Sequence, residues 1–265
     1  MQKVALITGG GESDRSLAQR PSVPVTHLFS IWTRSSSSNQ PRHQRMEAFP
    51  RRHEPSSGKE AAIALKATFH QTNVTDYSSL SNTFEKTFQE FGKIDFVFAN
   101  ADIVERDSFY AIFPSSGPPP EPDQLSVDID LKAVIATGYL AQHYFRQSLS
   151  GSSGCLISTS SVGGIYPSPF CQMYSAAKRG VIGFTRSVAK HFYTHDKIRA
   201  NAILPGTMKT ALLTEKEWET FGETEWTPIE KVVEVVEMLL DETQNHWGKT
   251  VEISGKRHYF REQVK

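Results

Sequence analysis

Short strand-like runs separated by longer segments of helical periodicity allow this chain very few architectures. The strand-like runs occupy residues 4–8, 68–74, 94–99, 156–158, 198–204 and 250–253, and the helical segments occupy 77–91, 123–149, 174–193 and 229–241. Strands that alternate with helices of this length indicate a parallel sheet covered on both faces. We therefore expect an α/β fold with a doubly wound parallel sheet, in a single domain spanning residues 1–265. Ligands of such sheets bind at the carboxyl ends of the strands.

Two segments depart from this pattern. Residues 12–57 are rich in Arg, Ser, Pro and His where the first helix and second strand should lie, and only "VTHLFSIW" at 25–32 could form a strand. Residues 114–122, "PSSGPPPEP", predict a proline-rich, extended loop near the mouth of the site. The segment 12–57 is therefore an irregular part of the predicted fold.

The charge balance favours small-molecule chemistry over nucleic-acid or membrane binding. The chain has 29 Lys and Arg residues against 29 Asp and Glu residues, so no net field attracts either polyanion. No apolar run approaches the roughly 20 residues of a membrane span, and "KVALITGG" follows the first residues without an apolar leader. Cys155 and Cys171 fit no metal-ligand spacing and are expected to be reduced thiols. We expect a cytoplasmic protein without a metal.

Tyr174 and Lys178 carry the clearest chemical signal. They lie four residues apart on a predicted helix, so both project from one face, and Ser161 stands just after a predicted strand. A tyrosine acts as a base only if its pKa, about 10 when unperturbed, is lowered, and a cation one helical turn away lowers it. A serine hydroxyl can hold the oxygen of an alcohol or carbonyl, so the three residues could remove a proton from an alcohol while hydride leaves its carbon. An isolated Tyr-x-x-x-Lys pair would equally fit an ordinary amphipathic helix.

Three further motifs accompany these residues in a fixed order. "NVTD" stands at 73–76, "ANAD" at 99–102 and "IRANAILPGTMKT" at 198–210. With the serine, tyrosine and lysine they resemble the short-chain dehydrogenase/reductase family, and the ending "GKTVEISGKRHYFREQ" is similar to its prostaglandin-dehydrogenase-like members, including many fungal ones. The resemblance implies a Rossmann-like sheet and an NAD(P)-dependent oxidoreductase.

The resemblance also assigns roles to particular residues. Ser161, Tyr174, Lys178 and Asp130 would be catalytic. The residues implied to bind the cofactor are Thr8, Gly9, Gly10, Asn73, Val74, Asn100, Tyr174, Lys178, Met208 and Thr210. Among these, the residue at 73 would approach the adenine and the threonine at 210 would bind near the nicotinamide amide.

Two aspartates depart from the family pattern. Asp130 stands where the family often has an asparagine that holds a water between the lysine and solvent. An aspartate there would favour the charged lysine while opposing a tyrosinate. Asp102 replaces the glycine of the family's Asn-Asn-Ala-Gly turn. It would place a carboxylate beside the cofactor path or, alternatively, be a surface turn residue.

The glycine turn after the first strand is incomplete. The family pattern there is Thr-Gly-x-x-x-Gly-Ile-Gly, whereas this chain reads "TGGGESD" at 8–14, and acidic side chains would repel a phosphate. We hypothesise that residues 12–57 are translated out of frame. Read from the third base, the codons of Trp32 and Thr33 must give aspartate, and an acid at the end of the second strand would bind the adenosine ribose and favour NAD over NADP.

The expected function is hydride transfer between a secondary alcohol and a ketone, with NAD or NADP as cofactor and NAD favoured. Six aromatic residues could line an apolar pocket, which favours a lipid, steroid-like or terpenoid metabolite of secondary metabolism: Phe109, Tyr110, Phe113, Tyr166, Phe170 and Trp218. The alternative is a catalytically impaired relative that acts as a non-redox or binding protein. Family members are commonly dimers or tetramers, so the resemblance also implies a homo-oligomer.

Overall fold

A computed structural model describes residues 3–9, 62–63, 67–105, 107–113, 117–148, 154–210, 212–213, 215–219, 221 and 225–262. Gly10, the possible strand at 25–32 and the whole segment 12–57 lie outside these residues, so the hypothesis about its reading frame stays a prediction. Residues 117–122 of the proline-rich segment form an exposed loop, as expected.

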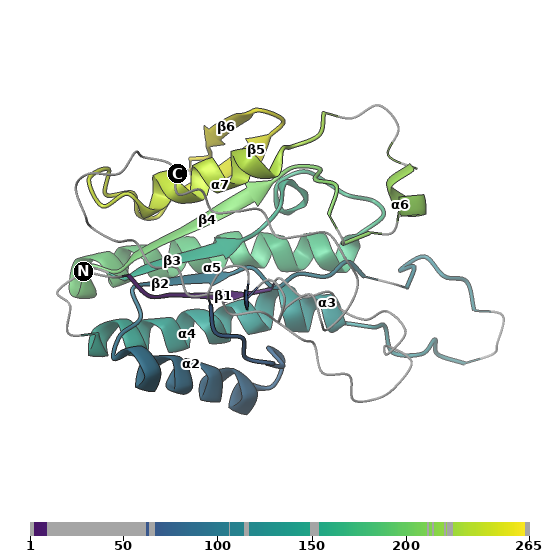
Figure 1. Ribbon diagram of the computed structural model, residues 1–265. Coiled ribbons are helices and arrows are strands. Elements are labelled where there is room, and N and C mark those ends of the chain that lie inside the picture. Colours follow the sequence, from purple (N-terminus) through teal and green to yellow (C-terminus); the bar gives the residue numbers. More distant parts are fainter. Residues whose placement is uncertain are drawn as a thin grey trace.

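The centre of the fold is one six-stranded sheet whose strands are adjacent in the order in which the chain makes them (Figure 1). The strands are β1 (Ala5–Thr8), β2 (Phe96–Ala99), β3 (Cys155–Thr159), β4 (Arg199–Pro205), β5 (Thr250–Ser254) and β6 (Arg257–Phe260). The first five are parallel, and β6 pairs antiparallel with β5. Because Thr8, Ala99 and Ser158 are in register, the carboxyl ends of β1, β2 and β3 meet at one edge.

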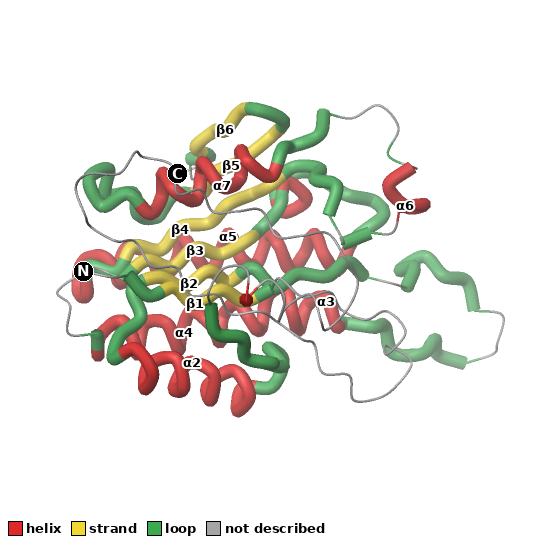
Figure 2. The backbone as a smooth tube through the Cα atoms, in the orientation of Figure 1, coloured by secondary structure: helices red, strands yellow, loops and turns green. Residues whose placement is uncertain are grey.

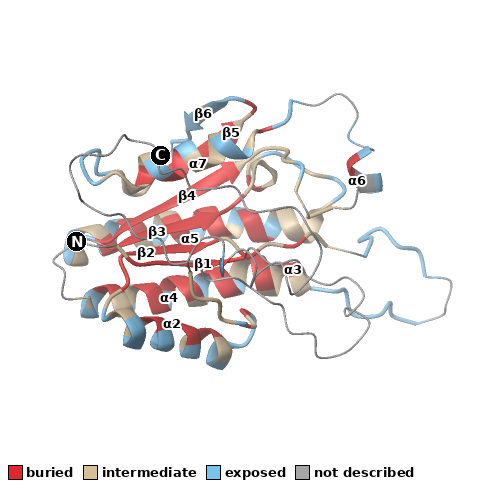
Figure 3. Cartoon of the chain, viewed as in Figure 1, coloured by how far each residue is buried: buried red, intermediate tan, exposed pale blue. Residues whose placement is uncertain are grey.

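Helices cover both faces of this sheet, as its alternating side chains require (Figures 1 and 2). On one face, Leu6, Val97 and Leu156 pack with residues of α2 (Tyr77–Phe91), α4 (Ala133–Gln147) and α5 (Gln172–Asp196). On the other face, the residues that alternate with them in β1, β2 and β3 form a second core that includes α7 (Ile229–Leu240). Figure 3 shows the strands buried between these layers. The expected single α/β domain of the Rossmann-like class is confirmed.

Short elements connect these layers. They are α3 (Leu125–Val127), η2 (Asp128–Lys132), η3 (Val162–Gly164) and α6 (Glu215–Glu219). Helix α2 has the predicted bounds because Asp76 caps its first turn by accepting from Ser78 N, and Gly92 ends it in the left-handed region at φ 69°. No helix in the described part of the chain is long and apolar enough to cross a membrane.

One prediction about the elements needs correction. The strand predicted over 68–74 is wrong, since this stretch joins no ladder. Its polar groups bond instead to α2, through Thr72 Oγ1 and Thr83 Oγ1 at 2.7 Å and from Asn73 N to Ser79 Oγ at 3.0 Å. The segment 123–149 is mostly helical as predicted, with the π-helical turn η2 between α3 and α4. The sequence pattern also gave no sign of β6, because its side chains are mostly exposed and show no apolar run.

Candidate active site

The site is built on the carboxyl ends of the central strands. Thr8 Oγ1 at the end of β1 accepts hydrogen bonds from Asn100 N at 2.9 Å and Ala101 N at 3.3 Å. Asn100 Oδ1 in turn accepts from Thr159 Oγ1 at 2.8 Å, which joins the end of β2 to the end of β3. Gly9 adopts φ 88°, and a β-carbon there would lie 2.9 Å from Asn100 O, so only glycine lets the chain pass this close.

Helix α5 presents the predicted tyrosine and lysine toward this edge. Its N-cap residue, Cys171, makes no side-chain capping bond. Instead Glu105, from the segment after β2, accepts from Gln172 N at 2.8 Å and from Tyr174 N at 2.7 Å. A carboxylate at a helix N-terminus accepts hydrogen bonds from its free N–H groups, and its negative charge interacts favourably with the positive end of the helix dipole. This carboxylate therefore fixes the turn that carries the tyrosine.

Ser161, Tyr174 and Lys178 come together as the sequence predicts. Ser161 is the N-cap of η3, where its Oγ accepts from Gly163 N at 3.1 Å. Ser161 Oγ and the Tyr174 ring both face Gly163, where a β-carbon would lie 3.6 Å from each, and the serine lowers the pKa of the Tyr174 hydroxyl. Lys178 Nζ lies 5.2 Å from the centroid of the Tyr174 ring. A β-carbon on Gly164 would lie 2.9 Å from the backbone of Lys178, so η3 packs directly on α5.

Lys178 is fully buried and is surrounded by oxygen atoms. Its Nζ donates to Thr159 O at 3.2 Å and lies 3.3 Å from Asp102 Oδ1 and 4.0 Å from Asp130 Oδ2. Asp130 comes from the π turn η2 and is also fully buried, with its Oδ1 accepting from Ile103 N at 3.0 Å. The interpretation of Asp102 as a surface turn residue is therefore wrong: it is an ion-pair partner of Lys178.

The electrostatics differ from the sequence expectation for the tyrosine. Burial raises the pKa of Tyr174 well above its ordinary value, Asp102 raises it further, and the hydrogen bond with Ser161 opposes the rise. The expected lowering by Lys178 does not prevail in the protein alone. The physical reason is first the burial of the tyrosine hydroxyl, which disfavours its charged form, and then the negative charges of Asp102 and Asp130, which both face the single lysine.

The other residues implied to bind a cofactor are distributed unevenly. Asn73 uses its Oδ1 within its own turn, accepting from Thr75 N at 3.1 Å and Thr75 Oγ1 at 2.8 Å. The Val74 side chain is buried in the core below α2. Met208 and Thr210 follow β4 and are partly buried, and Thr210 O accepts from Trp218 Nε1 at 2.8 Å. Of the predicted set, only Gly10 lies outside the described residues.

The predicted aromatic residues do not form one pocket. A hollow of about 220 Å³ beside the start of α5 is lined by Glu105, Asp107, Ser108, Tyr110, Pro169, Phe170 and Gln172. Phe109 and Phe113 are exposed near it along the chain. Trp218 is buried, with Phe221 and Trp226 against it. Tyr166 bonds Glu252 and Arg261 instead of lining the hollow.

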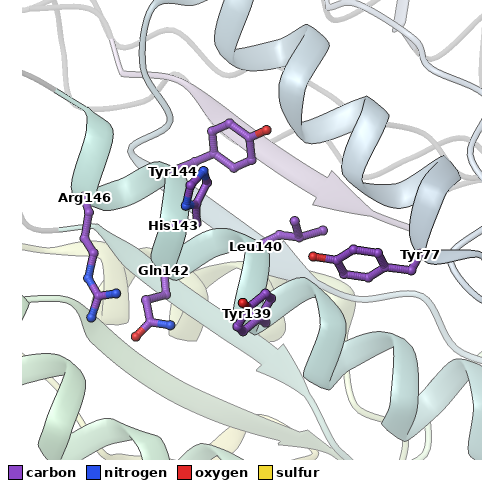
Figure 4. A pocket seen from close by; sticks show the side chains of 7 residues that line it. All are labelled: Tyr77, Tyr139, Leu140, Gln142, His143, Tyr144 and Arg146. Carbon is purple, nitrogen blue, oxygen red and sulfur yellow. The ribbon is translucent and has the colours of Figure 1, made fainter.

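A second hollow lies away from these residues, between α2 and α4 (Figure 4). It measures about 310 Å³ and is lined by Tyr77, Tyr139, Leu140, Gln142, His143, Tyr144 and Arg146. Figure 4 shows Tyr77 at the start of α2, facing the side chains of α4. None of the site residues described above lines it, so it does not belong to the candidate active site.

A parallel sheet that presents a serine, a tyrosine and a lysine at the carboxyl ends of its strands defines an α/β protein built to act on a small molecule. The more particular identity follows from a family model described as short chain dehydrogenase, which matches residues 50–220. The chain belongs to this family, whose members are NAD(P)-dependent oxidoreductases.

Individual relatives agree with this membership. The short-chain dehydrogenase/reductase prx7 of Penicillium rubens is 44% identical over 230 residues, covering 78% of this chain and 81% of the relative. Human 15-hydroxyprostaglandin dehydrogenase [NAD(+)] is 32% identical over 155 residues, covering 58% of this chain and 53% of the relative. The fold matches a crystal structure of 3-ketoacyl-(acyl-carrier-protein) reductase from Brucella melitensis complexed with NADH, with a TM-score of 0.65 at 19% identity, covering 76% and 83% of the two chains.

The described residues fit the nicotinamide-ribose half of the cofactor that the family uses. Lys178 and Asp102 place a buried ammonium beside a carboxylate oxygen, which are a donor and an acceptor suited to a ribose diol. Gly9 keeps side-chain bulk away from the end of β1. The phosphate-binding turn expected at Gly10 lies outside the described residues.

Sequence reasoning missed Glu105 and Thr159. Neither belongs to a motif, and each acts through tertiary contact: Glu105 caps α5 across 67 residues, and Thr159 offers its carbonyl to Lys178. The one available signal was the absence of a capping side chain at Cys171, which requires another group to satisfy the first turn of the helix.

Proposed function

We propose that this chain transfers hydride between a secondary alcohol and a ketone, with Ser161, Tyr174 and Lys178 as its catalytic residues. The observation that carries the proposal is their convergence: Ser161 lies close enough to the tyrosine hydroxyl to lower its pKa, and the lysine ammonium lies 5.2 Å from the tyrosine ring. An ordinary amphipathic helix would explain why Tyr174 and Lys178 share a face. It would not explain why a serine from another element lies near the Tyr174 hydroxyl. The convergence therefore supports acid–base chemistry at Tyr174.

Each side chain has a distinct task in alcohol oxidation. Ser161 Oγ holds the oxygen of the substrate, and Tyr174 Oη accepts the proton of the alcohol. Lys178 stabilises the tyrosinate form by its positive charge. A bound nicotinamide supplies the hydride acceptor or, in the reverse direction, the hydride donor. In ketone reduction Tyr174 returns the proton to the carbonyl oxygen.

We favour NAD over NADP as the cofactor. The human relative carries NAD(+) in its name, and the similar Brucella structure is a complex with NADH. The acid forced by the codons of Trp32 and Thr33 in the alternative reading frame also favours NAD, because a carboxylate repels a 2′-phosphate.

The substrate side of the proposal is an apolar secondary alcohol of the lipid, steroid-like or terpenoid kind, in secondary metabolism. Tyr110 and Phe170 contribute aromatic surface to the hollow beside α5, and they are 65% and 87% exposed, so this surface is open to a ligand. The prostaglandin dehydrogenase among the relatives acts on a lipid alcohol by its name, and prx7 comes from a fungus.

We further propose a cytoplasmic homo-oligomer that contacts itself through α4. Ile135 and Tyr139 on this helix are 41% and 63% exposed, and the 310 Å³ hollow lies along the same helix. Apolar surface of this kind on a helix of a folded protein is typical of subunit contact.

A catalytically impaired relative that only binds a ligand is the second candidate. The observation in its favour is the raised pKa of Tyr174, which opposes the tyrosinate form. A titration of the purified full chain with NADH and NADPH, followed by nucleotide fluorescence, separates the two. Saturable binding supports the enzyme, and its absence supports the impaired relative.

The test of catalysis is Tyr174→Phe, assayed by NAD reduction with a panel of apolar secondary alcohols. Loss of the proton acceptor should lower kcat by about 10²–10⁴ while the fold is retained. Tyr259→Phe, which removes an exposed hydroxyl in β6, is the matched control and should keep full activity. Near-full activity of Tyr174→Phe would exclude the proposed acid–base role.

A further inference from the structure

Two carboxyl groups face the single ammonium group of Lys178. Its Nζ faces Asp102 Oδ1 at 3.3 Å and Asp130 Oδ2 at 4.0 Å. The lysine and Asp130 are fully buried, and the Asp102 side chain is 21% exposed. Asp130 Oδ2 is buried and has no hydrogen-bond partner, although it points at this cluster.

The charges of this cluster do not balance if every group is ionised. With both carboxyl groups ionised, the cluster would carry one positive and two negative charges, leaving a net negative charge where the carboxyl oxygens that face the lysine are buried. An uncompensated buried charge is strongly unfavourable. Two carboxyl groups that share one site avoid this cost when one of them keeps its proton.

The geometry indicates which group is the acid. Asp102 is closer to the ammonium and reaches solvent, so it is suited to be the ionised partner. Asp130 is farther away and fully buried, and its one hydrogen bond is accepted by Oδ1 from Ile103 N. Asp102 Oδ1 and Asp130 Oδ2 are both buried without a hydrogen-bond partner, and Asp130 Oδ2 is the one farther from the ammonium, at 4.0 Å against 3.3 Å, so it is the atom suited to hold the proton.

We propose that Asp102 and Asp130 share a single proton across Lys178, and that this carboxyl pair is a positioning device for the reaction proposed above. At neutral pH the pair carries one negative charge, which matches the lysine and holds it beside Tyr174. When the pair loses its remaining proton in alkali, the added negative charge opposes ionisation of Tyr174. The role rests on the proposed function, whereas the shared proton does not.

The electrostatics of the individual groups agree with this assignment. Burial raises the pKa of Asp130 well above its usual range against the attraction of Lys178, and Asp102 raises it further. Burial also raises the pKa of Asp102, again opposed by Lys178. The titratable and charged groups that face the cluster are Tyr174, Lys178 and Cys171 at the start of α5, Asp102 after β2, and Asp130 in η2.

Infrared spectroscopy of the full chain without nucleotide tests the shared proton directly. The wild type should show the carbonyl stretch of a protonated carboxylic acid at neutral pH. Asp130→Asn should abolish the band, since it removes the acid. Asp102→Asn should abolish it as well, because Asp130 then ionises to become the only partner of the lysine.

The control is Asp128→Asn, also in η2, where the carboxylate is 39% exposed and pairs with Lys132. This variant should keep the band. An absent band in the wild type, or a band that survives Asp102→Asn, would overturn the shared proton. Because Asp102 is partly exposed, its variant tests the proposal even if the buried Asp130→Asn does not fold.

The pH–rate profile tests the link to Tyr174. In both asparagine variants the pH of half-maximal alcohol oxidation should fall by about one unit, since the second ionisation of the pair no longer acts on the tyrosine. Identical profiles in wild type and variants would overturn this link. The expected band pattern in a chain that oxidises no alcohol would support the shared proton and contradict the proposed function.

Discussion

Gly9 shows how one residue holds the ends of two strands together. Its φ of 88° is in the left-handed region, and a β-carbon at this position would lie only 2.9 Å from Asn100 O, so there is no room for a side chain. The same close approach brings Thr8 Oγ1 within hydrogen-bond distance of the N–H groups of residues 100 and 101. Gly9 therefore supplies the left-handed backbone conformation and also allows β1 and the segment after β2 to lie this close together.

Gly9→Ala should lower the free energy of unfolding by about 2 kcal/mol, because the new methyl group is both strained and overpacked. Urea denaturation measures the change. Gly183→Ala is the control: a β-carbon at this position of α5 meets no atom within 4 Å, so helix propensity should stabilise the fold by about 0.5–1 kcal/mol. Equal stability of Gly9→Ala and wild type would show that the strand ends can separate.

Residue identity predicted that Ser161, Tyr174 and Lys178 would lie together, but not the direction in which the pKa of Tyr174 is shifted. The four-residue spacing of Tyr174 and Lys178 fixes one helix face, so their proximity follows from local geometry. The raised pKa of Tyr174 depends on burial, and then on the carboxyl groups that tertiary packing brings near it. Asp102 and Asp130 are 28 positions apart in the chain, and no local pattern shows that they face the same ammonium.

At the scale of elements, α5 depends on a segment that precedes it by many residues. Glu105 accepts hydrogen bonds from two N–H groups of the first turn of this helix and also lines the 220 Å³ hollow. Glu105 therefore links the wall of this hollow to the helix turn that carries Tyr174. The π turn η2 has a similar role for Asp130, and such turns often occur at functional positions.

Glu105→Ala should cost about 1–2 kcal/mol of stability, as the loss of a helix cap does, and it should lower kcat because Tyr174 loses its backbone anchor. Thermal unfolding and alcohol oxidation measure the two effects. Glu237→Ala, which removes an exposed acid of α7 away from the hollow, is the control and should change neither. A stability loss with unchanged kcat would mean that the cap serves folding only.

Helices and strands with a strong apolar periodicity could be predicted from the sequence. Bounds and strands that depend on contacts with distant parts of the chain could not. The bounds of α2 were predicted from its apolar spacing and the glycine that follows it, and the structure adds Asp76 as the cap of its first turn. The start of α5 was placed two residues late because its cap lies elsewhere in the chain. Strand β6 could not be recognised because an edge strand with exposed side chains has no apolar period.

At the scale of the whole molecule, one polar network joins the site to the last strands. Arg261 donates to Glu252 Oε2 at 2.6 Å and to Tyr166 Oη at 2.8 Å, and Ser254 Oγ donates to Glu252 Oε1 at 3.0 Å. Tyr166 follows η3, so the network ties the segment after the candidate serine to β5 and β6. The Glu252 carboxylate accepts directly from Tyr166 Oη at 3.2 Å, across 86 positions of the chain.

This network should make the free energy of unfolding depend on pH in the acid range. Burial would raise the pKa of Glu252, but its hydrogen bonds from Arg261, Ser254 and Tyr166 and the charge of Arg261 outweigh burial and lower it. A lowered folded-state pKa contributes stability above the unfolded value, near 4.3, and this contribution is lost as pH falls through the folded value.

Glu252→Gln should therefore be less stable than wild type at neutral pH and should lose less stability on acidification. Urea midpoints measured from neutral pH down through the acid range test this. Glu237→Gln, an exposed position on α7, is the control and should follow the wild-type curve. Parallel curves for Glu252→Gln and wild type would mean that this carboxylate does not control the acid response.

The sheet order has a consequence for how the protein can be made. Among the described residues, each strand from β2 to β6 lies next to the described strand that precedes it in the chain. Such a strand leaving the ribosome therefore finds a hydrogen-bonding neighbour already translated, and none of them has to be inserted between two earlier described strands. Within this part of the sheet, each addition closes only the connection that has just emerged. The β5–β6 pair would be the last of the described strands to join, so this part of the sheet can be assembled in the order of its own translation.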